Sequence, residues 1–509
     1  MRTVRCLGAS LFGAGAELVT VEAHVEPKEK GGTEVLLTGL PDSVLRESKG
    51  RIQCALSENG LDLAPGRLFL NLVPAARRKS GEILDLPLAL AAAAASGHFD
   101  PRVLRGAIFL GELGIDGRLH AVPGGLAAAI AAKDRGIVRL FGPVATAAEA
   151  AAFPAIEAFG AESLAQVVAH IAGARALPRA TPEEYTMTNT SGERSLDDVR
   201  GLVDAKLALA AAAAGGHAIL LVGPPGAGKS MLARRLPRLL PPPDLEERLA
   251  ITRVLSAAGR WPGGLARERP FRSPHHTTSY AGLVGGGPAA TPGEITLAHG
   301  GVLFLDEFPE FRRDVLEALR EPIESGTITI SRATQRVDLP ARFQLVAAMN
   351  PCPCGYRGHP RVPCRCPPTA IERYRNRISG PLLDRIDLVV EVAATDAEEL
   401  LRRPEERRVD PAATEGAVVK RVRAAVERAL VRQSGKRNAD LGADGLDEHA
   451  ALDDRSRRLL SDAAARRSLS ARAIQSLRRV ARTCADLAEQ EQVGVSHVAQ
   501  ALALRASIG

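Results

Sequence analysis

The chain has 509 residues, 45% of them apolar and 25% charged, and its formal net charge is +7. At about 100–200 residues per domain, this length predicts about three domains, each able to bury a core. The apolar content excludes a largely disordered chain, and the mildly basic balance permits a nucleic-acid partner without requiring one. Aromatic residues supply only 3% while alanine and leucine are abundant, which predicts a helix-rich core.

No stretch of the sequence predicts a transmembrane helix. The longest stretch without a charged side chain, Leu207–Gly228, is interrupted by Gly215, Gly216, Pro224 and Pro225, whereas a membrane span needs about 20 predominantly apolar residues. The apolar run near the start of the sequence resembles a signal peptide only weakly, because it is short, broken by glycine and followed by an alternating strand pattern. We therefore expect a cytoplasmic protein with no membrane partner.

Residues 1–173 alternate between strand and helix patterns, which predicts an α/β domain. The predicted strands are Leu18–Val25, Glu34–Leu40 and Arg67–Val73, and the predicted helices are Ser43–Glu58, Leu86–Ala95 and Gly124–Arg135. A polar segment containing proline and threonine follows at 174–194, and this composition is typical of a linker.

The pattern changes in residues 195–394, which predict a parallel sheet. Short, nearly continuous apolar runs are typical of buried parallel strands, and they occur at Ala218–Val222, Gly301–Leu305 and Phe343–Ala348. From 395 to 509 we expect helices alone. The predicted fold class is therefore α/β, with a parallel-sheet core and a helical C-terminal lid.

A glycine-rich turn lies between the predicted strand at 218–222 and the helix that follows it. The turn matches the phosphate-binding pattern G-x-x-x-x-G-K-[ST] in full, with Gly223, Pro224, Pro225, Gly226, Ala227, Gly228, Lys229 and Ser230. Backbone N–H groups of such a loop surround phosphates, the lysine reaches the β- and γ-phosphates, and the serine is a Mg²⁺ ligand. The alternative is a plain glycine turn, but motif and context together favour binding of ATP and Mg²⁺.

A second motif follows the apolar run that ends at Leu305. There Asp306 would lie at the Mg²⁺ end of the nucleotide, and Glu307 would polarise the attacking water. An apolar strand that ends in Asp-Glu is common in α/β proteins. Its position after the phosphate loop makes the pair informative, and the two motifs together predict ATP hydrolysis.

Three further polar side chains fit a hydrolytic site. Asn350 follows an apolar strand and would orient the attacking water, Arg385 would act as an arginine finger on a neighbouring subunit, and Arg472 would reach the γ-phosphate from the lid. The ordinary explanation for either arginine is a surface salt bridge, and the residues alone favour that explanation.

Several longer motifs resemble those of the magnesium-chelatase-like AAA+ ATPases, and within them the YifB/ComM competence-protein family. Besides the nucleotide motifs, the resemblance rests on Arg269–Thr277, Pro292–Ile295, Arg320–Gly326 and Leu469–Arg472. It extends over essentially the whole chain. It implies an AAA+ core in which Asn350 is the first sensor, Arg385 the finger and Arg472 the second sensor.

The resemblance also implies two insertions and an activity. Ser273–Gly293 would be an insert in the second helix, with His275 and His276 near its base, and Thr327–Leu339 would be a hairpin before the sensor strand. In ring-shaped relatives such loops point into a central pore. Relatives are implied to act as hexamers that drive branch migration on single-stranded and branched DNA in recombination and natural transformation.

Two charged side chains of that hairpin are candidate DNA contacts. Arg332 and Arg336 would bind phosphates, and the alternative is that they are solvated loop charges. Two other functions stay open, namely a magnesium-chelatase-type motor subunit that remodels a protein partner and a Lon-like ATP-dependent protease.

The N-terminal domain resembles the Lon protease catalytic domain at Gly111–Leu119 and Pro123–Leu126. Lon-type chemistry needs a serine nucleophile and a lysine base. The stretch around the nucleophile position, Gly81–Pro87, contains no serine, and Ala127–Ala129 stand where relatives carry the lysine. The nearby pair of Lys79 and Ser80 has the wrong spacing. We therefore expect a Lon-like fold without peptidase activity.

Four of the seven cysteines lie within fifteen residues of each other, at Cys352, Cys354, Cys364 and Cys366. Four thiolates at this spacing can form a tetrahedral Zn²⁺ site, although Cys-x-Cys is tighter than the usual pair. The alternatives are four reduced thiols in a loop or a labile disulfide. We favour zinc, because a reducing compartment disfavours a disulfide.

Overall fold

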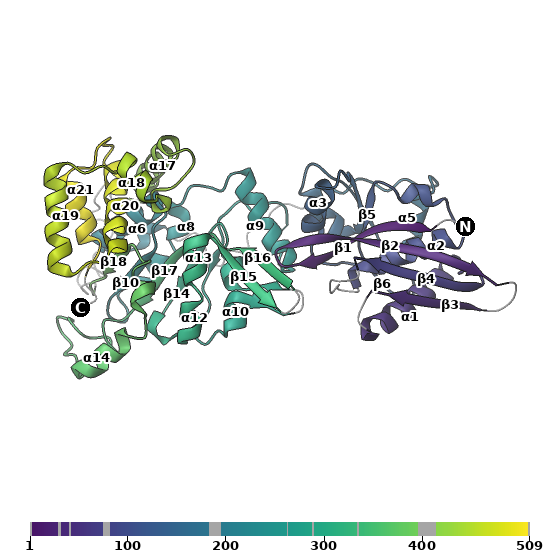
Figure 1. Cartoon of the computed structure of the whole chain (residues 1–509), viewed down its shortest axis with the longest axis horizontal. Coiled ribbons are helices and arrows are strands. Elements are labelled where there is room, and N and C mark those ends of the chain that lie inside the picture. Colours follow the sequence, from purple (N-terminus) through teal and green to yellow (C-terminus); the bar gives the residue numbers. More distant parts are fainter. Residues whose placement is uncertain are drawn as a thin grey trace.

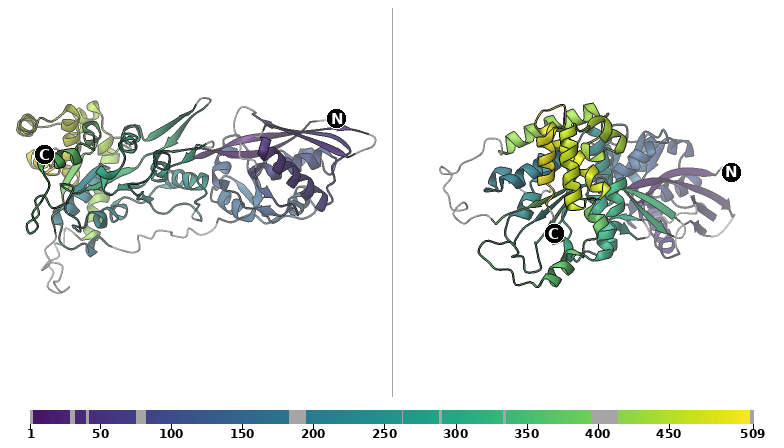
Figure 2. Two further views of the ribbon diagram at one scale, coloured as in Figure 1. Left: turned by 90° about the horizontal axis from the view of Figure 1, so that it is seen from below. Right: turned by 60° about the vertical axis from the view of Figure 1, so that its left-hand side comes forward.

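The computed structural model describes residues 3–28, 32–39, 42–74, 82–182, 195–261, 263–287, 290–332, 335–394 and 414–506. The molecule is elongated (Figure 1), with the N-terminal region at one end and the C-terminal helices at the other. A view from below (Figure 2) shows the same long arrangement, in which the parallel sheet lies between these two ends.

The N-terminal region contains two main sheets. Its strands are β1 (Val4–Phe12), β2 (Gly15–Pro27), β3 (Thr33–Thr38), β4 (Gly66–Val73), β5 (Ala107–Phe109), β6 (Glu112–Leu113), β7 (Leu119–His120), β8 (Arg139–Pro143) and β9 (Glu157–Ala161). The first sheet has the order β1-β2-β4-β3, and only its β3–β4 pair is parallel. The second sheet, β5-β8-β9, is parallel throughout, and β6 and β7 form a short separate ladder.

Five helices accompany these sheets: α1 (Asp42–Glu58), α2 (Asp85–Ala95), α3 (Gly125–Lys133), α4 (Val144–Ala151) and α5 (Leu164–Ile171). Helix α2 is buried over almost its whole length, because it packs against β1, β2 and α1. Its first residue, Asp85, has no solvent exposure and pairs with Arg51 at 2.9 Å. Burial raises the pKa of Asp85 to about 6, and Arg51 limits the rise.

The elements predicted for this region correspond to β2, β3, β4, α1, α2 and α3, with ends displaced by a few residues. Leu40, the predicted end of one strand, lies outside the described residues. Strands β1, β5, β8 and β9 had no counterpart among the predicted elements. Gly8 interrupts the apolar alternation in the sequence of β1. Its missing side chain leaves room for Leu84 and Pro87.

A five-stranded parallel sheet forms the central region. Its strands are β10 (Ile219–Val222), β11 (Phe271–Arg272), β14 (Val302–Leu305), β17 (Gln344–Met349) and β18 (Leu388–Glu391), in the order β11-β14-β17-β10-β18. Strands β14 and β17 are buried at every residue, as expected for a sheet covered on both faces. All pairs are parallel, so the carboxyl ends of β10, β14 and β17 meet at one edge.

Short helices surround this sheet. They are α6 (Val203–Gly215), α7 (Lys229–Ala233), α8 (Leu236–Leu239), α9 (Leu245–Ala257), α10 (Tyr280–Val284), α11 (Glu294–Leu297), α12 (Arg313–Glu317), α13 (Arg320–Ser325), α14 (Pro368–Arg375) and α15 (Gly380–Leu383). Helix α9 begins at a capping box, in which Asp244 and Glu247 exchange side-chain and backbone hydrogen bonds.

Two short excursions leave the central region, one after β11 and one before β17. The segment between β11 and α11 contains α10 and the small ladder of β12 (Gly285–Gly286) with β13 (Thr291–Pro292). Arg272 and Glu294 close its base through two 2.7 Å hydrogen bonds. The segment expected to form a hairpin contains β15 (Thr327–Arg332) and β16 (Gln335–Pro340), which pair antiparallel.

The described C-terminal part is helical, as expected. Its helices are α17 (Glu415–Arg432), α18 (Ala443–His449), α19 (Asp454–Arg467), α20 (Ala471–Leu487) and α21 (Val495–Ala503). Helices α17 and α20 pack on α6, and their apolar side chains share one core with the face of the sheet that α6 covers. None of the helices in the described ranges combines the length and apolar character that crossing a membrane requires.

The N-terminal region contacts the central region at the turn between β1 and β2. Ala14 shares a small apolar cluster with Val254 of α9 and Leu339 of β16. Close by, the backbone N–H of Ala127 in α3 donates to Ser256 Oγ at 3.3 Å. The hairpin and α9 therefore form the surface on which the N-terminal region rests.

Candidate nucleotide-binding site

The predicted phosphate loop lies at the carboxyl end of β10, where the sequence motif required it. Strand β10 is almost entirely buried, so its position is fixed by packing on both sides. Gly226 and Gly228 have φ values of +77° and +88°, which side chains other than glycine rarely tolerate. The glycines therefore let the loop turn back over the start of α7.

Lys229 is the first residue of α7, and its ammonium group is surrounded by acceptors. Its Nζ donates to the carbonyls of Gly223 at 2.6 Å and Pro224 at 2.9 Å and to Asn350 Oδ1 at 3.1 Å. Burial lowers the pKa of Lys229, and the nearby carboxylates of Asp306 and Glu307 oppose this effect. The positive charge thus lies at the point where the loop and the tip of β17 meet.

The two predicted magnesium ligands lie in direct contact. Ser230 Oγ donates to Asp306 Oδ2 at 2.6 Å, because β14 ends beside the start of α7. A hydroxyl and a carboxylate are hard oxygen donors, which suit Mg²⁺ together with nucleotide phosphates. The donor set therefore fits the ion that the sequence motifs imply.

Glu307 contacts the insert that follows β11. Its Oε2 lies 2.9 Å from His276 Nδ1, and its backbone has a positive φ of 53°, a conformation that is uncommon outside glycine. The rings of His276 and His275 contact one another at a tilt of 34°, with centroids 4.1 Å apart, and His275 in turn contacts Thr277. The predicted water-polarising carboxylate is therefore linked to the base of the insert, a contact that no sequence motif indicated.

Asn350 follows the buried strand β17 and is supported from α14. Besides accepting from Lys229 at its side chain, Asn350 donates its backbone N–H to the hydroxyl oxygen of the buried Tyr374, whose pKa rises to about 12 because of burial. This support holds the predicted first sensor against the phosphate loop.

Arg385 and Arg472 meet on a different carboxylate. Arg385 NH2 lies 2.6 Å and Arg472 NH2 3.1 Å from the same oxygen, Oε1 of Glu324 in α13. The Arg385 side chain is 8% exposed, whereas those of Arg472 and Glu324 are 54% and 49% exposed. In the described part of the chain, both ion-pair with Glu324 rather than with the phosphate loop. The six predicted catalytic side chains therefore form two clusters.

A buried polar contact joins the segments that carry these two arginines. Asp387, two residues after Arg385, accepts from His217 Nδ1 at 3.0 Å and from Ser476 Oγ of α20 at 2.5 Å. Burial alone would raise the pKa of Asp387, but the hydrogen bonds from His217 and Ser476 hold it below its usual value. Helix α20 begins at Ala471, so Asp387 ties the start of β18 to the helix that bears Arg472.

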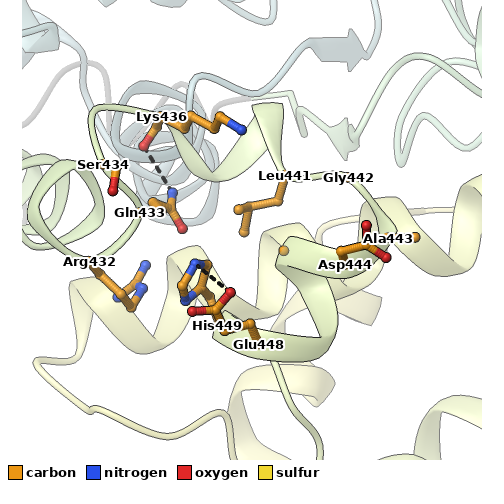
Figure 3. A pocket seen from close by; sticks show the side chains of 11 residues that line it. Arg432, Gln433, Ser434, Lys436, Leu441, Gly442, Ala443, Asp444, Glu448 and His449 are labelled. Atoms are coloured by element: carbon orange, nitrogen blue, oxygen red, sulfur yellow. Dashed lines mark hydrogen bonds and ion pairs between the residues drawn. The ribbon is translucent and has the colours of Figure 1, made fainter.

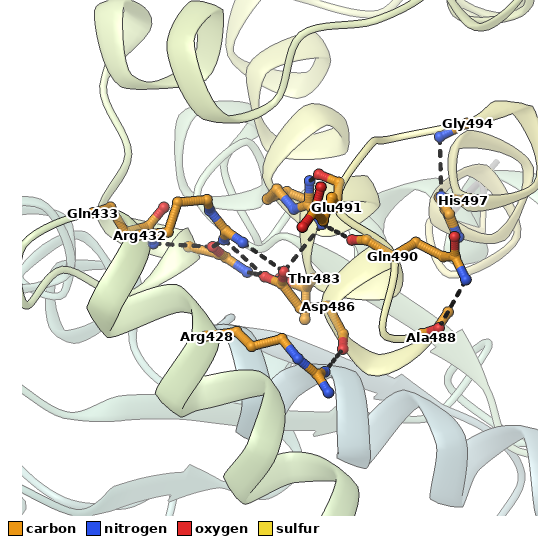
Figure 4. Close-up of polar contacts among 12 residues, drawn as sticks. Arg428, Arg432, Gln433, Thr483, Asp486, Ala488, Gln490, Glu491, Gly494 and His497 are labelled. Carbon is orange, nitrogen blue, oxygen red and sulfur yellow. Dashed lines mark hydrogen bonds and ion pairs between the residues drawn. The ribbon is translucent and has the colours of Figure 1, made fainter.

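A second buried carboxylate holds the C-terminal helices to one another (Figure 4). Asp486 of α20 accepts from Arg432 at 2.7 and 2.9 Å, from Asn438 at 2.8 Å and from Arg482 at 3.0 Å. Because a buried charge is costly unless it is paired, this cluster requires α17 and α20 to stay together.

One pocket of about 420 Å³ lies in the same helical region (Figure 3). Its lining includes Arg432, Gln433, Leu441 and His449. None of the residues predicted for catalysis or nucleotide binding lines it. The pocket is therefore separate from the nucleotide cluster.

The four clustered cysteines lie directly after Asn350. The Sγ atom of Cys352 is 3.4 Å from that of Cys354 and 3.6 Å from that of Cys364, and the sulfur atoms of these residues and Cys366 all lie within 4.8 Å of one another. Four thiolates at about 2.3 Å from a tetrahedral Zn²⁺ would be separated by about 3.8 Å. The sulfur positions therefore fit a metal ion.

Other predicted positions contribute less to the nucleotide site. Arg336 on the hairpin makes an exposed 3.6 Å ion pair with Asp338, whereas the side chain of Arg332 and the pair Lys79 and Ser80 lie outside the described residues. Ala127–Ala129, at the expected lysine position of Lon-like enzymes, are buried in α3.

Three family models match the chain. The model described as "Magnesium chelatase, subunit ChlI" matches residues 195–400, "Subunit ChlI of Mg-chelatase" matches residues 21–146, and "Magnesium chelatase, subunit ChlI C-terminal" matches residues 413–505. Together these matches extend over most of the chain.

Individual relatives are similar over nearly their whole length. YifB of Salmonella typhimurium is 40% identical over 506 residues, covering 97% of this chain and 95% of its own. The competence protein ComM of Haemophilus influenzae is 40% identical over 503 residues, covering 98% and 96%. A shorter match, 30% identical over 133 residues, covers 26% of this chain and 15% of the DNA replication licensing factor MCM3 homolog 1 of Zea mays. The chain therefore belongs to the YifB/ComM family of magnesium-chelatase-like AAA+ ATPases.

Proposed function

We propose that this chain is an ATP-hydrolysing DNA motor that works as a hexameric ring in the cytoplasm. It drives branch migration on single-stranded and branched DNA in homologous recombination and natural transformation. The observation that carries the proposal is the division of the site. Lys229 and Asn350 lie together with the magnesium ligands, whereas Arg385 and Arg472 converge on Glu324. A ring completes each site with arginines from the adjacent subunit.

The family implies ATP and Mg²⁺, and the nucleotide cluster offers a role for each of its polar groups. The loop from Gly223 to Ser230 binds the phosphates, and Lys229 exchanges its carbonyl acceptors for phosphate oxygens. Ser230 and Asp306 would hold Mg²⁺, and the bound ion would supply positive charge beside the nucleotide phosphates. Glu307 polarises the attacking water, and Asn350 orients it.

The two arginines supply the charge that this cluster lacks. Arg385 stabilises the negative charge that develops on the transferred phosphoryl group of the neighbouring subunit's ATP, and Arg472 acts on the same nucleotide. Their meeting at one oxygen of Glu324 supports joint action, because two guanidinium groups within reach of one oxygen can bind one phosphate.

Support for DNA as the partner comes from two sources. ComM is named a competence protein, and the relative from Zea mays is named a DNA replication licensing factor. In this chain, the insert base contacts Glu307 through His276. A DNA strand that moves the insert or the hairpin would thereby alter the carboxylate that polarises water.

Each of four segments of the chain has its own role in the proposed motor. Residues 1–173 form a Lon-like domain that lacks peptidase activity and serves assembly or DNA handling, and residues 174–194 link it to the motor. Residues 195–394 form the AAA+ core with its insert, hairpin and cysteine loop, and residues 395–509 form the helical lid. The burial of Ala127–Ala129 supports the loss of peptidase chemistry.

The four cysteines bind one structural Zn²⁺. The support is their mutual distance and the chemistry of four thiolates, which favours zinc in a reducing compartment. A zinc ion held by four thiolates has no open position, so its role is to hold the loop after Asn350 in place.

The test is the ATPase rate of the full chain alone, with single-stranded DNA and with a branched junction, followed by three-strand exchange. DNA should stimulate hydrolysis, and ATP should drive branch migration. A chelatase-type motor subunit would instead respond to a protein partner, and a Lon-like protease would degrade unfolded protein with ATP. Absence of both DNA stimulation and strand exchange would refute the motor.

A further inference from the structure

The cysteine loop, residues Cys352–Cys366, begins where the nucleotide site ends. Asn350 contacts Lys229, and Cys352, two residues later, has no solvent exposure. Pro351 between them accepts a hydrogen bond from Arg375 at 3.4 Å. The first thiol is therefore fixed to the strand end that carries the predicted first sensor.

The cysteine loop packs against the phosphate loop at Gly355. A Cβ atom added at Gly355 would lie 2.6 Å from Pro225 Cδ and 2.8 Å from Pro225 Cγ. Gly355 is buried, has a φ of +84°, and donates its backbone N–H to the carbonyl of Cys352 at 2.9 Å. Only a residue without a side chain fits here, so the backbone of the cysteine loop forms part of the wall behind the phosphate loop.

The remainder of the cysteine loop is largely exposed. Between the two cysteine pairs, residues 357–363 are exposed except for the half-buried His359. Cys354 donates its backbone N–H to Cys366 Sγ at 3.4 Å, so the two pairs meet through sulfur rather than through an apolar core. Ordering such a loop costs conformational entropy, which a metal bound by all four thiolates would offset.

We propose that the metal of the four cysteines acts as a support for the nucleotide site, so that its presence sets the affinity of the phosphate loop for ATP. Binding of the metal by the four cysteines holds Gly355 against Pro225 and keeps Asn350 beside Lys229. Loss of the metal releases both contacts and weakens nucleotide binding without touching any group that contacts the nucleotide. This inference rests on the proposed zinc site and is independent of the proposed action on DNA.

The most selective test compares two glycine substitutions in the full chain. Gly355→Ala places a Cβ against Pro225, whereas Gly358→Ala introduces the same positive-φ strain, at +77°, in a position with no heavy atom within 4 Å. We expect Gly355→Ala to keep the metal and to weaken binding of a fluorescent ATP analogue about tenfold. Gly358→Ala should match the wild type in metal content and in affinity for the ATP analogue. Equal affinity for the two variants would overturn the inference.

A second comparison removes the metal itself. Zinc per chain is measured by mass spectrometry for the wild type, for Cys366→Ser and for the exposed control Cys54→Ser, together with analogue affinity and thermal unfolding. We expect about one equivalent of zinc in the wild type and in Cys54→Ser. Cys366→Ser should lose the zinc and bind the analogue about tenfold more weakly.

The outcomes separate the linked proposals. A wild-type protein without metal would refute the zinc site and the support together, and the ATPase with DNA would still decide the motor. A metal-free Cys366→Ser that binds the analogue as tightly as the wild type would refute the support alone. If Cys366→Ser does not fold, the affinity of the wild type for the analogue before and after removal of the metal by a chelator decides, and an unchanged affinity would refute the support.

Discussion

The nucleotide cluster and the arginine cluster differ in what a single chain can complete. In the first, Lys229 and Ser230 find their partners on neighbouring strand ends of the same sheet. In the second, Arg385 and Arg472 are held by Glu324, a carboxylate of their own chain. Since an arginine that stabilises phosphoryl transfer must reach a phosphate, the arginine cluster has the form of half a site. We therefore expect that mutations can separate nucleotide binding from hydrolysis.

Loss of the phosphate-loop lysine should have the largest effect. Lys229→Ala removes the charge at the centre of the nucleotide cluster, so we expect loss of analogue binding and a fall in ATP hydrolysis of more than about a thousandfold. The measurement is steady-state phosphate release together with fluorescence titration. Lys420→Ala, which changes an exposed lysine on α17, is the matched control. Retained hydrolysis in Lys229→Ala would contradict the assignment of the loop.

The arginine cluster should affect hydrolysis without affecting binding. Arg385→Ala should lower the hydrolysis rate by about a thousandfold and leave analogue affinity within about twofold of the wild type, because the nucleotide cluster is intact. Arg312→Ala, an exposed arginine paired with Asp314, controls for loss of positive charge. Loss of tight analogue binding in Arg385→Ala would count against the role of Arg385 as an arginine finger. Mixing Arg385→Ala subunits with Lys229→Ala subunits should restore part of the ATPase activity.

The contact of His276 with Glu307 should lower the rate of ATP hydrolysis in the absence of DNA. His276→Ala frees the carboxylate, so we expect DNA-independent hydrolysis to rise about fivefold at unchanged KM, and DNA stimulation to shrink accordingly. His276→Asn, which can still hydrogen-bond to the carboxylate, should restore most of the difference. The neighbouring His275→Ala removes a ring that faces Thr277 instead, and it should change little. Identical effects of the two alanine variants would refute a specific link.

Glu324 should affect assembly. Glu324→Gln weakens the acceptor that both arginines share, so the arginines become available to a neighbouring subunit's phosphate. We expect the protein concentration for half-maximal ATPase to fall about threefold, measured by dilution series. A rise in that concentration would show that Glu324 positions the arginines rather than competing with the phosphate.

Asp387 should have the smallest effect on chemistry and a measurable one on stability. Its pKa is held below the usual value, so its contribution is present above the unfolded-state pKa and is lost as the pH falls through the folded-state value. Asp387→Asn should therefore lower the free energy of unfolding by about 2 kcal/mol at neutral pH, and the difference should shrink below about pH 4. Denaturant unfolding at several pH values measures this. A pH-independent difference would contradict the charged role.

Sequence reasoning succeeded where a feature was contiguous in the chain. The phosphate loop, the apolar strands ending at Leu305 and Met349, and the hairpin beginning at Thr327 each depend on short-range patterns. Strand β1 was missed because its alternation is interrupted. Residues that act across long sequence separations left no pattern either. Glu324 looks like any helix carboxylate until α20 brings Arg472 to it.

The same limit applies to the cysteine loop. The spacing of its cysteines indicated a metal site, but the fit of Gly355 against Pro225 depends on two loops separated by more than a hundred residues. A glycine in a loop has many ordinary explanations, so only the tertiary structure distinguishes Gly355 from Gly358. The motifs predicted which side chains would serve the site, but they gave no sign of the packing between the two loops.

The β1–β2 turn of the N-terminal region packs directly against the hairpin of β15 and β16. Gly13 lies so close to Val337 and Leu339 that an added Cβ would come within 2.9 Å of both side chains, and Ala14 packs in the same cluster. The β1–β2 turn and the hairpin are therefore packed so tightly that neither can shift without displacing the other, and the N-terminal region restrains the position of β15 and β16.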